Sequence, residues 1–572
     1  MKRVSAIPIA AACVLIAAAT ALGASTDVRV SNGSPPTPFS QNKQNEPAIT
    51  VDAHAPNVLV AGSNDEIDEQ GCNASSCPFT AGIGVSGVYF SFDSGQTWTQ
   101  PTYQGWSARH CLSGPCTPHV GPIGTLPLYF ENGLVADGDP GVAFGPRLVN
   151  GKFTWASGSR LYYSNLTSNF SSVPANETFN GFEAIAISRT DNVTAAAANH
   201  QNAWMAPVII SRQSGTTFSD KEQIWADNAS SSPFFGNVYV CWARFQGQEL
   251  GRAAPAQLQV AVSSDGGDTW TEHPIGAAAN NGQRNPLDGC TVRSSSNGTA
   301  YVFGKATLSS GGHQTFEVMS TSTDGGLTWS SPNPVAGPVT QPGLFDAVLG
   351  RPTIDGIAGA RSDLANAPSV DIANGAPTGA DATNRIVMSY VSGTIDKQHV
   401  FFTESADGGA KWSTPRAVET GANDHGYYTA PAISPNGTDV YVVYNAFTTP
   451  YRNNTTDPRS LVGVMVHADV SGASTGAFTE LDRGVSGDPR GSSQNNLKGE
   501  FLGDYVYATA TRTYGAAVWN DARNDADCTA VDTWRMSLRG AGGVPKPAPL
   551  AVCPATFGNT DIFGGAFADP TP

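Results

Sequence analysis

Three acidic residues, Asp65, Glu66 and Asp68, lie close together just after an apolar run at positions 57–61. Carboxylates this close repel one another, so at least one of them should keep its proton to a higher pH than a free side chain does. A carboxylic acid that is still protonated near neutral pH can act as a general acid. If the protein is an enzyme, we expect its acid here, with Asp65 and Glu66 as catalytic candidates.

Arg351 follows Gly350 and opens another apolar run, and Arg284 also leads into a predicted strand. A guanidinium presents a fixed fork of donors that matches a carboxylate or another anionic group. We therefore predict that Arg284 and Arg351 bind substrate. The alternative for Arg351 is a salt bridge to an acid of a neighbouring strand such as Asp288, and the sequence favours neither reading.

Acidic residues also stand at or just before the starts of several predicted strands. Such an Asp often does no more than bond neighbouring backbone amides, and this remains the alternative for each one. If the strand starts converge, their carboxylates can instead face a ligand. The substrate-binding candidates of this kind are Asp139, Asp288 and Asp504.

An octapeptide with the pattern S-x-D-x-G-x-[TK]-W occurs four times, at residues 91–98, 263–270, 322–329 and 405–412. Each copy follows a short run of residues that favour β-strands. An Asp that can bond backbone amides, followed by a Gly that can adopt positive φ, is typical of a tight hairpin turn. The Trp then opens the returning strand and can pack under the turn. The repeat therefore indicates a structural device, and its four copies indicate a repeated fold.

The four octapeptides resemble the Asp-box, or BNR repeat, of the sialidase superfamily. The resemblance implies a β-propeller in which each box lies on the outer hairpin of a blade, away from the central site. Seven segments fit such blades, with starts near residues 46, 139, 220, 286, 351, 429 and 502. We therefore predict an all-β protein, a propeller of four-stranded antiparallel blades. Seven blades are favoured, and six, the number expected from sialidases, is the alternative.

The last predicted unit lacks a clear fourth strand. Its third strand is placed at residues 534–537, and the alternating run at 27–31 can supply the fourth. Pairing of the two ends of the chain would close the ring and remove exposed strand edges. The expected organisation is a signal peptide at 1–24, followed by a propeller domain at 25–572 closed by its N-terminal strand.

The resemblance also implies a catalytic template: three arginines that hold the substrate carboxylate, an Asp acid/base, and a Tyr nucleophile paired with a Glu. Asp65 lies in the right kind of loop for the acid, and Tyr427 and Glu500 lie in late loops where such a pair could face the axis. The family's first Arg belongs to an Arg-Ile-Pro motif, but here the corresponding run is Asn-Glu-Pro at 45–47. A main substrate clamp is therefore missing.

The composition of the chain limits the kinds of binding partner and the cellular compartment that we expect. The net charge is -16, which argues against binding to nucleic acid or to an anionic membrane. The basic and then apolar residues at 1–24 read as a secretory signal, and no other stretch is long enough for a membrane span. Without Cys13, eight of the nine cysteines remain, and an even number in an exported chain suggests disulfides. The pairs considered are Cys72 with Cys77, Cys111 with Cys116, Cys241 with Cys290, and Cys528 with Cys553.

The expected function is that of a secreted, sialidase-like glycoside hydrolase, monomeric and acting on a carbohydrate in the central cleft. A non-catalytic propeller that binds glycan or protein is the alternative, and a polysaccharide lyase is a weaker one. No cofactor is indicated by a specific motif. The acidic run at 519–528 could hold Ca²⁺, but it lacks the glycine and the distal Glu of an EF-hand loop.

Overall fold

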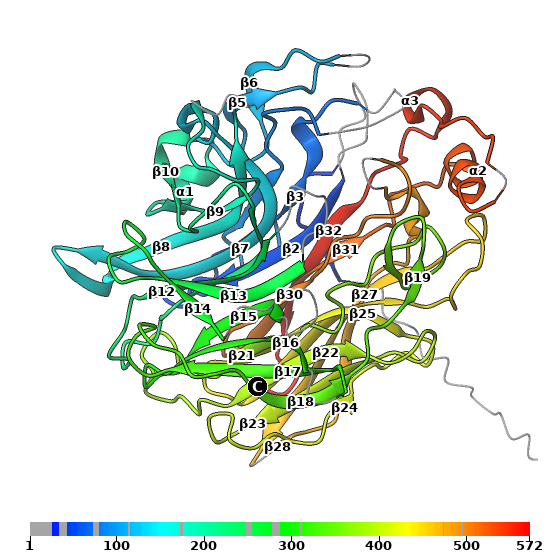
Figure 1. Cartoon of the computed structure of the whole chain (residues 1–572). Coiled ribbons are helices and arrows are strands. Elements are labelled where there is room, and N and C mark those ends of the chain that lie inside the picture. Colours follow the sequence, from blue (N-terminus) through cyan, green and yellow to red (C-terminus); the bar gives the residue numbers. More distant parts are fainter. Residues whose placement is uncertain are drawn as a thin grey trace, which may run out of the picture.

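The computed structural model describes residues 26–33, 43–71, 79–111, 115–171, 176–246, 254–276, 287–308, 312–472, 474–493, 496–540 and 542–572. The predicted signal peptide, Arg284 and the pair Cys72 and Cys77 lie outside these residues. Strands dominate the described chain (Figure 1), and no helix in it is long and apolar enough to cross a membrane.

The described residues form seven antiparallel blades, so the predicted fold class is confirmed. Blade 1 consists of β2 (Gln44–Val51), β3 (Leu59–Asp65) and β4 (Ser86–Ser91), and blade 2 of β7 (Leu134–Val149), β8 (Lys152–Asn169), β9 (Ala184–Thr190) and β10 (Trp204–Ile209). Blade 3 consists of β11 (Thr217–Ala226), β12 (Val238–Gln246), β13 (Ala254–Ser263) and β14 (Thr271–Ile275), and blade 4 of β15 (Leu287–Ser294), β16 (Ala300–Leu308), β17 (Gln314–Ser322) and β18 (Asn333–Val339). In blade 1 an isolated bridge between Phe90 and Thr99 takes the place of the fourth strand.

The remaining blades follow the same order. Their strands are β21 (Ser369–Ile372), β22 (Ile386–Ser392), β23 (His399–Ser405) and β24 (Arg416–Ala417) in blade 5; β25 (His425–Ile433), β26 (Asp439–Phe447), β27 (Leu461–Ser471) and β29 (Thr479–Arg483) in blade 6, with β28 (Ser474–Thr475) beside the end of β27; and β30 (Tyr507–Ala510), β31 (Tyr514–Asp521), β32 (Asp561–Ala568) and β1 (Val28–Arg29) in blade 7.

The first strands of successive blades contact one another in a closed ring, in the order β2, β7, β11, β15, β21, β25, β30 and back to β2. This arrangement defines a propeller, because the residues at the start of every first strand then converge around one axis. Two hairpins lie outside the blades, β5 (Tyr103–Ser107) with β6 (His119–Ile123), and β19 (Leu344–Asp346) with β20 (Arg351–Thr353). The helices are short: α1 (Val193–Ala197), α2 (Thr529–Ser537) and α3 (Pro549–Val552).

The N-terminal strand closes the ring as expected. β1 pairs antiparallel with β32, with Val28 opposite Gly564. The predicted third strand of this blade is wrong, because residues 534–537 belong to α2. Val531 and Trp534 have helical spacing and are buried together against Leu497. That packing selects a helix, and β32 serves as the third strand.

The predicted start of blade 5 is also wrong. Arg351 lies in β20, which pairs with β19 outside the blades, and the first strand of the blade is β21. In blade 2 the outer hairpin does not lie around residues 209–212 either. The third strand, β9, is connected to β10 through α1, so a helical turn replaces the octapeptide in that blade.

The four octapeptide turns have one geometry, shown here for the copy at 263–270. The Ser263 hydroxyl donates to Asp265 Oδ1 (2.8 Å), and the Gly267 amide donates to the Ser263 hydroxyl (2.8 Å). Asp265 Oδ1 also accepts from the amide of Thr269 (3.0 Å), and the Trp270 indole donates to the Gly267 carbonyl (3.0 Å). The same four bonds recur in the other copies. Each turn ends the third strand of blade 1, 3, 4 or 5, where it was predicted.

The Trp rings of these turns are half-buried. We expect Trp270→Ala to lower the free energy of unfolding by about 2 kcal/mol, roughly half the cost of removing a fully buried ring. Chemical denaturation of the variant would measure this loss. A loss below about 0.5 kcal/mol would show that the ring adds nothing to the hairpin.

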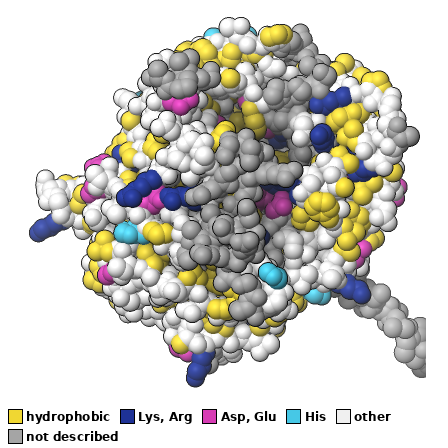
Figure 2. Space-filling model, viewed as in Figure 1, with side chains coloured by type: hydrophobic (Ala, Val, Ile, Leu, Met, Phe, Trp, Pro, Cys, Tyr) yellow, Lys and Arg dark blue, Asp and Glu magenta, His cyan; other side chains and the backbone are white. Residues whose placement is uncertain are grey.

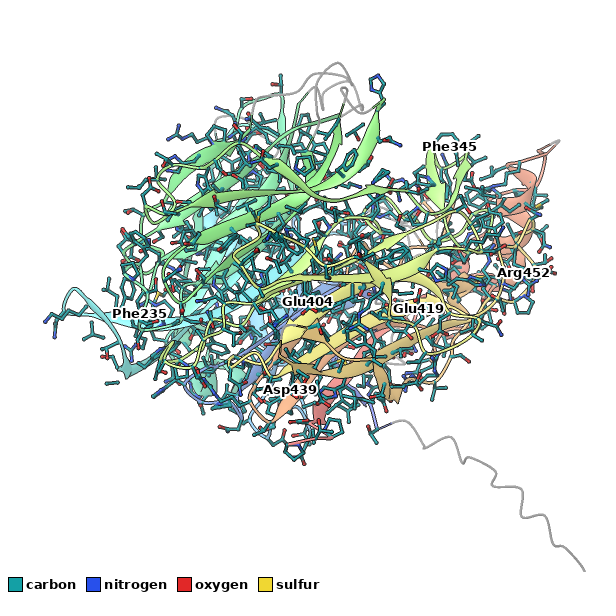
Figure 3. The ribbon with its side chains drawn as sticks, turned by 90° about the horizontal axis from the view of Figure 1, so that it is seen from below. Phe235, Phe345, Glu404, Glu419, Asp439 and Arg452 are labelled. Carbon is teal, nitrogen blue, oxygen red and sulfur yellow. A yellow bond between two sulfur atoms is a disulfide. The ribbon has the colours of Figure 1, made fainter. Side chains whose placement is uncertain are left out.

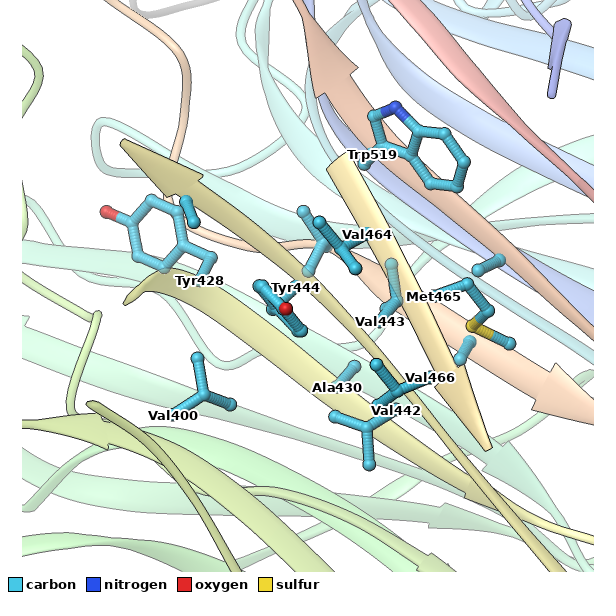
Figure 4. Close-up of a cluster of buried hydrophobic side chains, with 14 of the residues drawn as sticks. Val400, Tyr428, Ala430, Val442, Val443, Tyr444, Val464, Met465, Val466 and Trp519 are labelled. Carbon is cyan, nitrogen blue, oxygen red and sulfur yellow. The ribbon is translucent and has the colours of Figure 1, made fainter. Parts of the chain in front are cut away.

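The core lies within and between the blades. Figure 4 shows part of it, with Val442, Val443 and Val464 of blade 6 and Trp519 of blade 7; all four side chains are buried. Three disulfides were predicted correctly: Cys111–Cys116, Cys528–Cys553, and Cys241–Cys290, which joins blade 3 to blade 4. On the face in Figure 2 charged side chains are sparse, in keeping with a charged fraction of only 14%.

Candidate functional site

The first strands of blades 1, 2 and 3 share an unusual backbone feature near their starts. Each ladder shifts register there, and the bulged residue has positive φ: 54° at Glu46, 52° at Asp139 and 64° at Lys221. Gly289 occupies the equivalent place in blade 4 with a φ of 55°. Positive φ costs a side-chain-bearing residue energy, and such strain gathers at functional sites. These three charged residues therefore identify the centre of the axial face as the candidate site.

The three strained residues meet around the ammonium of Lys221. Its Nζ lies 2.7 Å from Asp504 Oδ2, 2.8 Å from Asp139 Oδ2, 3.5 Å from Asp220 Oδ1 and 3.8 Å from Glu46 Oε1. Four carboxyl groups thus surround one cation. We call these five residues, together with Arg361, the axial cluster.

Arg361 supplies the second cation of the axial cluster. Its guanidinium donates to both carboxylate oxygens of Asp504, at 2.9 and 2.5 Å, and to Glu46 Oε1 at 3.1 Å. It also lies over the ring of Phe501, 4.5 Å from the centroid. The fork of Arg361 is therefore engaged by protein carboxylates.

Burial and charge divide the carboxyl groups of the axial cluster into two kinds. Burial raises the pKa of Asp220 to about 8, and it raises the pKa of Glu46 well above its usual value with help from the charge of Asp139. Burial acts in the same direction on Asp504, but Arg361 and Lys221 outweigh it and hold its pKa below the usual value. Lys221 likewise lowers the pKa of Asp139. Protonated and ionised carboxyl groups therefore stand side by side, as acid–base chemistry requires.

A cleft with a cavity of about 370 Å³ opens beside the axial cluster. We call it the acidic cleft, because two carboxyl groups, Asp137 and Glu183, line it together with the rings of Phe79 and Phe170. Burial raises the pKa of Asp137 to about 7. Burial and then the charges of Asp137 and Asp220 raise the pKa of Glu183 well above its usual value. The amide of Ser219, which directly precedes Asp220, donates to the carbonyl of Glu183 (3.2 Å), so the cleft lies next to the axial cluster.

Asp65 and Glu66 lie in blade 1, apart from the axial cluster. Asp65 is fully buried and accepts from Tyr89 Oη (3.0 Å) and Gln100 Nε2 (2.8 Å), while Glu66 pairs with Lys43 at 2.9 Å. The pKa of Asp65 is raised to about 6 and that of Asp68 to about 7. The expected direction is confirmed, but the main cause is burial and not the crowding of like charges. Their catalytic role stays a prediction.

The raised pKa of Asp68 makes stability depend on pH. The folded protein holds this proton more tightly than the unfolded chain, so the favourable contribution is complete below about pH 4 and is lost as the pH rises through 7. From pH 5 to pH 8 we expect Asp68 to remove about 2 to 3 kcal/mol from the free energy of unfolding. Asp68→Asn should abolish that part of the pH dependence, while the exposed control Asp396→Asn should not. Equal slopes for wild type and Asp68→Asn in denaturant titrations would contradict this account.

Tyr427 and Glu500 are not hydrogen-bonded to each other. Tyr427 is buried beside the axial cluster, where its hydroxyl donates to the carbonyls of Arg361 (2.9 Å) and Gly503 (3.3 Å). Glu500 is fully buried and pairs with Arg459, which also lies 3.3 Å from Asp355. The structure therefore brings Tyr427 to the site and places Glu500 in a separate buried ion pair.

Of the predicted substrate-binding residues, some lie in the axial cluster and others lie outside it. Asp139 and Asp504 meet in the axial cluster. Arg351 pairs with Asp363 at 3.3 Å, not with Asp288, and its charge helps to lower the pKa of Asp504, so it lies near the rim of the cluster. Asp288 accepts from the amide of Gly289 (2.8 Å), as the backbone-bonding alternative foresaw.

Sequence reasoning did not single out Arg361, Asp137 or Glu183, and it did not predict how the charged residues at the strand starts pair with one another. Lys221 and Glu46 were recognisable as charged residues at strand starts, but nothing marked them as partners. Arg361 comes from the connection between β20 and β21 and reaches Glu46 across 315 positions of the chain. Glu183 follows a stretch without strand periodicity. The sequence does contain a signal for Glu46 and Asp139. Each is an acidic residue directly before a Pro, at 46–47 and 139–140, and in both blades this pair lies at the bulge of the first strand.

A second cavity, of about 220 Å³, lies at the other end of the first strands. Its charged groups are engaged with each other or with neighbours: Arg293 lies 3.3 Å from Asp371 and 4.8 Å from the ring centre of Trp225, and Arg512 pairs with Asp381. It has apolar walls and paired charges, which suit binding of a small molecule more than acid–base chemistry.

No protein-family model and no curated protein matches the sequence. Among solved structures, the chain is similar to a Hadza microbial sialidase (14% identity, TM-score 0.38, 71% of this chain and 63% of that one) and to Trypanosoma rangeli sialidase in complex with the inhibitor DANA (13%, 0.40, 78% and 59%). It is also similar to the intramolecular trans-sialidase from Ruminococcus gnavus in complex with oseltamivir carboxylate (12%, 0.38, 71% and 91%).

This chain spans about three fifths of the length of the first two of these neighbours. At these identities and TM-scores the likeness carries no argument about activity. The class of protein is defined by strand pairing and by the axial face: a seven-bladed propeller with a carboxyl-rich axial site.

Proposed function

We propose that this protein is a secreted glycoside hydrolase that cleaves a glycosidic bond in the acidic cleft. The observation that carries the proposal is the pair Asp137 and Glu183, two carboxyl groups of raised pKa that share a cleft with aromatic rings. Glycosidases most often use two carboxyl groups across the scissile bond. Aromatic rings offer apolar faces against which sugar rings can pack.

The two carboxyl groups divide the roles by their affinity for protons. Burial and the charge of Asp137 raise the pKa of Glu183, so we assign Glu183 the role of general acid, which donates its proton to the leaving oxygen. Asp137, with a pKa raised by burial to about 7, is assigned the role of base or nucleophile. Activity should therefore rise with pH through about 7 as Asp137 ionises, and fall when Glu183 loses its proton.

The substrate we propose is a glycan without a carboxylate at the cleaved sugar. Arg361 is engaged by Asp504 and Glu46, and Arg351 by Asp363, so neither is poised as an open clamp for an acid sugar. We also propose that the four octapeptides are Asp-boxes of the sialidase superfamily. The three disulfides support the proposal that the protein is exported.

The test is incubation of the purified protein with neutral glycans, sialosides and uronate polymers, followed by analysis of the products. Release of reducing sugar from a neutral glycan supports the proposal. Release from sialosides alone would overturn the substrate class. An unsaturated product would identify a lyase, and no product from any substrate would favour a binding propeller.

A non-catalytic binding propeller is the second candidate, and the cavity of about 220 Å³ at the other end of the first strands favours it. Binding there would be measured by calorimetry with the same glycans cut to mono- and disaccharides. Saturable binding without turnover would support this candidate.

A further inference from the structure

Four side chains converge at the outer part of blades 6 and 7, far from the axial cluster in the fold. Asp439 opens β26, His467 and Asp469 lie in β27, and Asp569 directly follows β32. One donor atom from each lies within 4.8 Å of the other three. Figure 3 shows Asp439 toward the outer edge of the molecule. We call these four residues the rim site.

The spacing of the donor atoms matches the edges of a metal coordination shell. His467 Nε2 lies 3.2 Å from Asp439 Oδ1, 3.8 Å from Asp569 Oδ1 and 3.9 Å from Asp469 Oδ1. Ligands bound at about 2.0 to 2.2 Å in a tetrahedron stand about 3.3 to 3.6 Å apart. The three distances from His467 Nε2 each lie within a few tenths of an ångström of this range, and the remaining donor atoms lie within 4.8 Å of one another.

Charge supplies an independent reason for a cation. The side chains of Asp439, Asp569 and His467 are only 8%, 5% and 3% exposed, and Asp439 stands directly opposite Asp469 in the β-ladder. Like charges in that position destabilise a sheet, and buried carboxylates need a positive partner. No Lys or Arg among the described residues forms an ion pair with any of the three carboxylates.

Hydrogen bonds within the chain do not remove this need. A neutral imidazole has a single N–H and can donate from Nε2 to only one of the three carboxylates. The hydroxyl of Thr571 lies within hydrogen-bond distance of both Asp569 Oδ1 (3.2 Å) and Asp469 and can donate to one of them at a time, and the hydroxyl of Thr438 donates to Asp439. These neutral donors leave the negative charges in place.

We propose that the rim site binds one divalent transition-metal ion, with Zn²⁺ as the best fit. An imidazole nitrogen is a common ligand of Zn²⁺, whereas Ca²⁺ and Mg²⁺ take oxygen ligands. The ion would join residues of blade 6 to Asp569, which directly follows the third strand of blade 7. Its role is to hold these two blades together, and it is independent of the proposed glycosidase chemistry.

The experiment uses the full chain, treated with EDTA and then dialysed. Calorimetric titration with Zn²⁺ should show one bound equivalent, and the melting temperature should rise with Zn²⁺ and fall again with EDTA. Ca²⁺ titrated in the same way should bind at least about tenfold more weakly. A Ca²⁺ affinity equal to or above that of Zn²⁺ would overturn the assignment of the metal class.

Asp469→Asn is the most informative variant, because Asp469 is 57% exposed and the substitution does not disturb packing. We expect it, and Asp569→Asn, to weaken Zn²⁺ binding at least about tenfold. Asp457→Asn, at an exposed Asp of the loop between β26 and β27, is the matched control and should bind as wild type does. If the wild type binds no Zn²⁺, or if both rim variants bind it unchanged, the site is only a His–Asp ion-pair network and the proposal is wrong.

Discussion

Lys221→Met is expected to destabilise the protein by about 3 to 5 kcal/mol, the cost of leaving buried charge without its partner. The ammonium of Lys221 is the only cation within 4 Å of Asp139 among the described residues, and it also contacts Asp504. Arg361 still compensates Asp504 in the variant, so most of the loss should come from Asp139. Denaturant titration at pH 7 would measure it.

The double variant Lys221→Met/Asp139→Asn tests that assignment. Removing the stranded carboxylate should restore about half of the lost stability, because the Asn has no charge to desolvate. Lys397→Met, at an exposed Lys, is the matched control and should change stability by less than about 0.5 kcal/mol. If Lys221→Met behaves like this control, the axial cluster is hydrated and its ion pairs contribute nothing to the fold.

Glu183→Gln should lower kcat on the substrate found in the glycan panel by about 10² to 10⁴-fold, the usual contribution of a general acid. Gln keeps the shape of the side chain but has no proton to donate to the leaving oxygen. Because burial raises the pKa of Glu183, the uncharged Gln should fold at least as well as the wild type. The expected result is thus a large loss of turnover with an unchanged or higher melting temperature.

Two comparisons make the result specific to the acidic cleft. Asp137→Asn should lose turnover to a similar extent and abolish the rise of activity through pH 7. Glu131→Gln, at an exposed Glu outside the cleft, should keep wild-type kinetics. If Glu183→Gln retains more than a tenth of the turnover, the acid lies elsewhere, and Asp65 becomes the next residue to replace.

The fold could be predicted because the turns that connect its strands are specified by residues close together in the sequence. The octapeptide turns use hydrogen bonds that span only a few residues, such as Gly267 to Ser263, so they act in the same way wherever they occur. The pairing of 27–31 with the last blade followed from counting strands. The predicted strands at 351 and 534–537 were wrong because tertiary contacts decide the structure there. β20 pairs with β19 outside the blades, and residues 534–537 form a helix that buries Trp534.

The site could be predicted only in part, because its partners are distant in sequence. Asp139 and Asp504 were recognised as strand-start carboxylates, yet nothing in the sequence showed that Lys221 joins them. Arg361 bonds Asp504 across 143 positions. Nor can a sequence show how deeply a carboxyl group is buried, and burial is what sets the pKa of Glu183, Asp137 and Asp220.

The antiparallel pairing of β1 with β32 has a consequence for the order in which the blades fold. The amide of Ile562 donates to the hydroxyl of Ser31, a contact between residues 531 positions apart. Closing so long a loop from a disordered chain would cost on the order of 5 to 6 kcal/mol in entropy, whereas folded blades between the two ends would already bring them together. Blade 7 should therefore be the last to form, after β32 has been synthesised. Until β1 pairs with it, β32 remains an open strand edge, and intermolecular pairing at that edge is the expected route of misassembly.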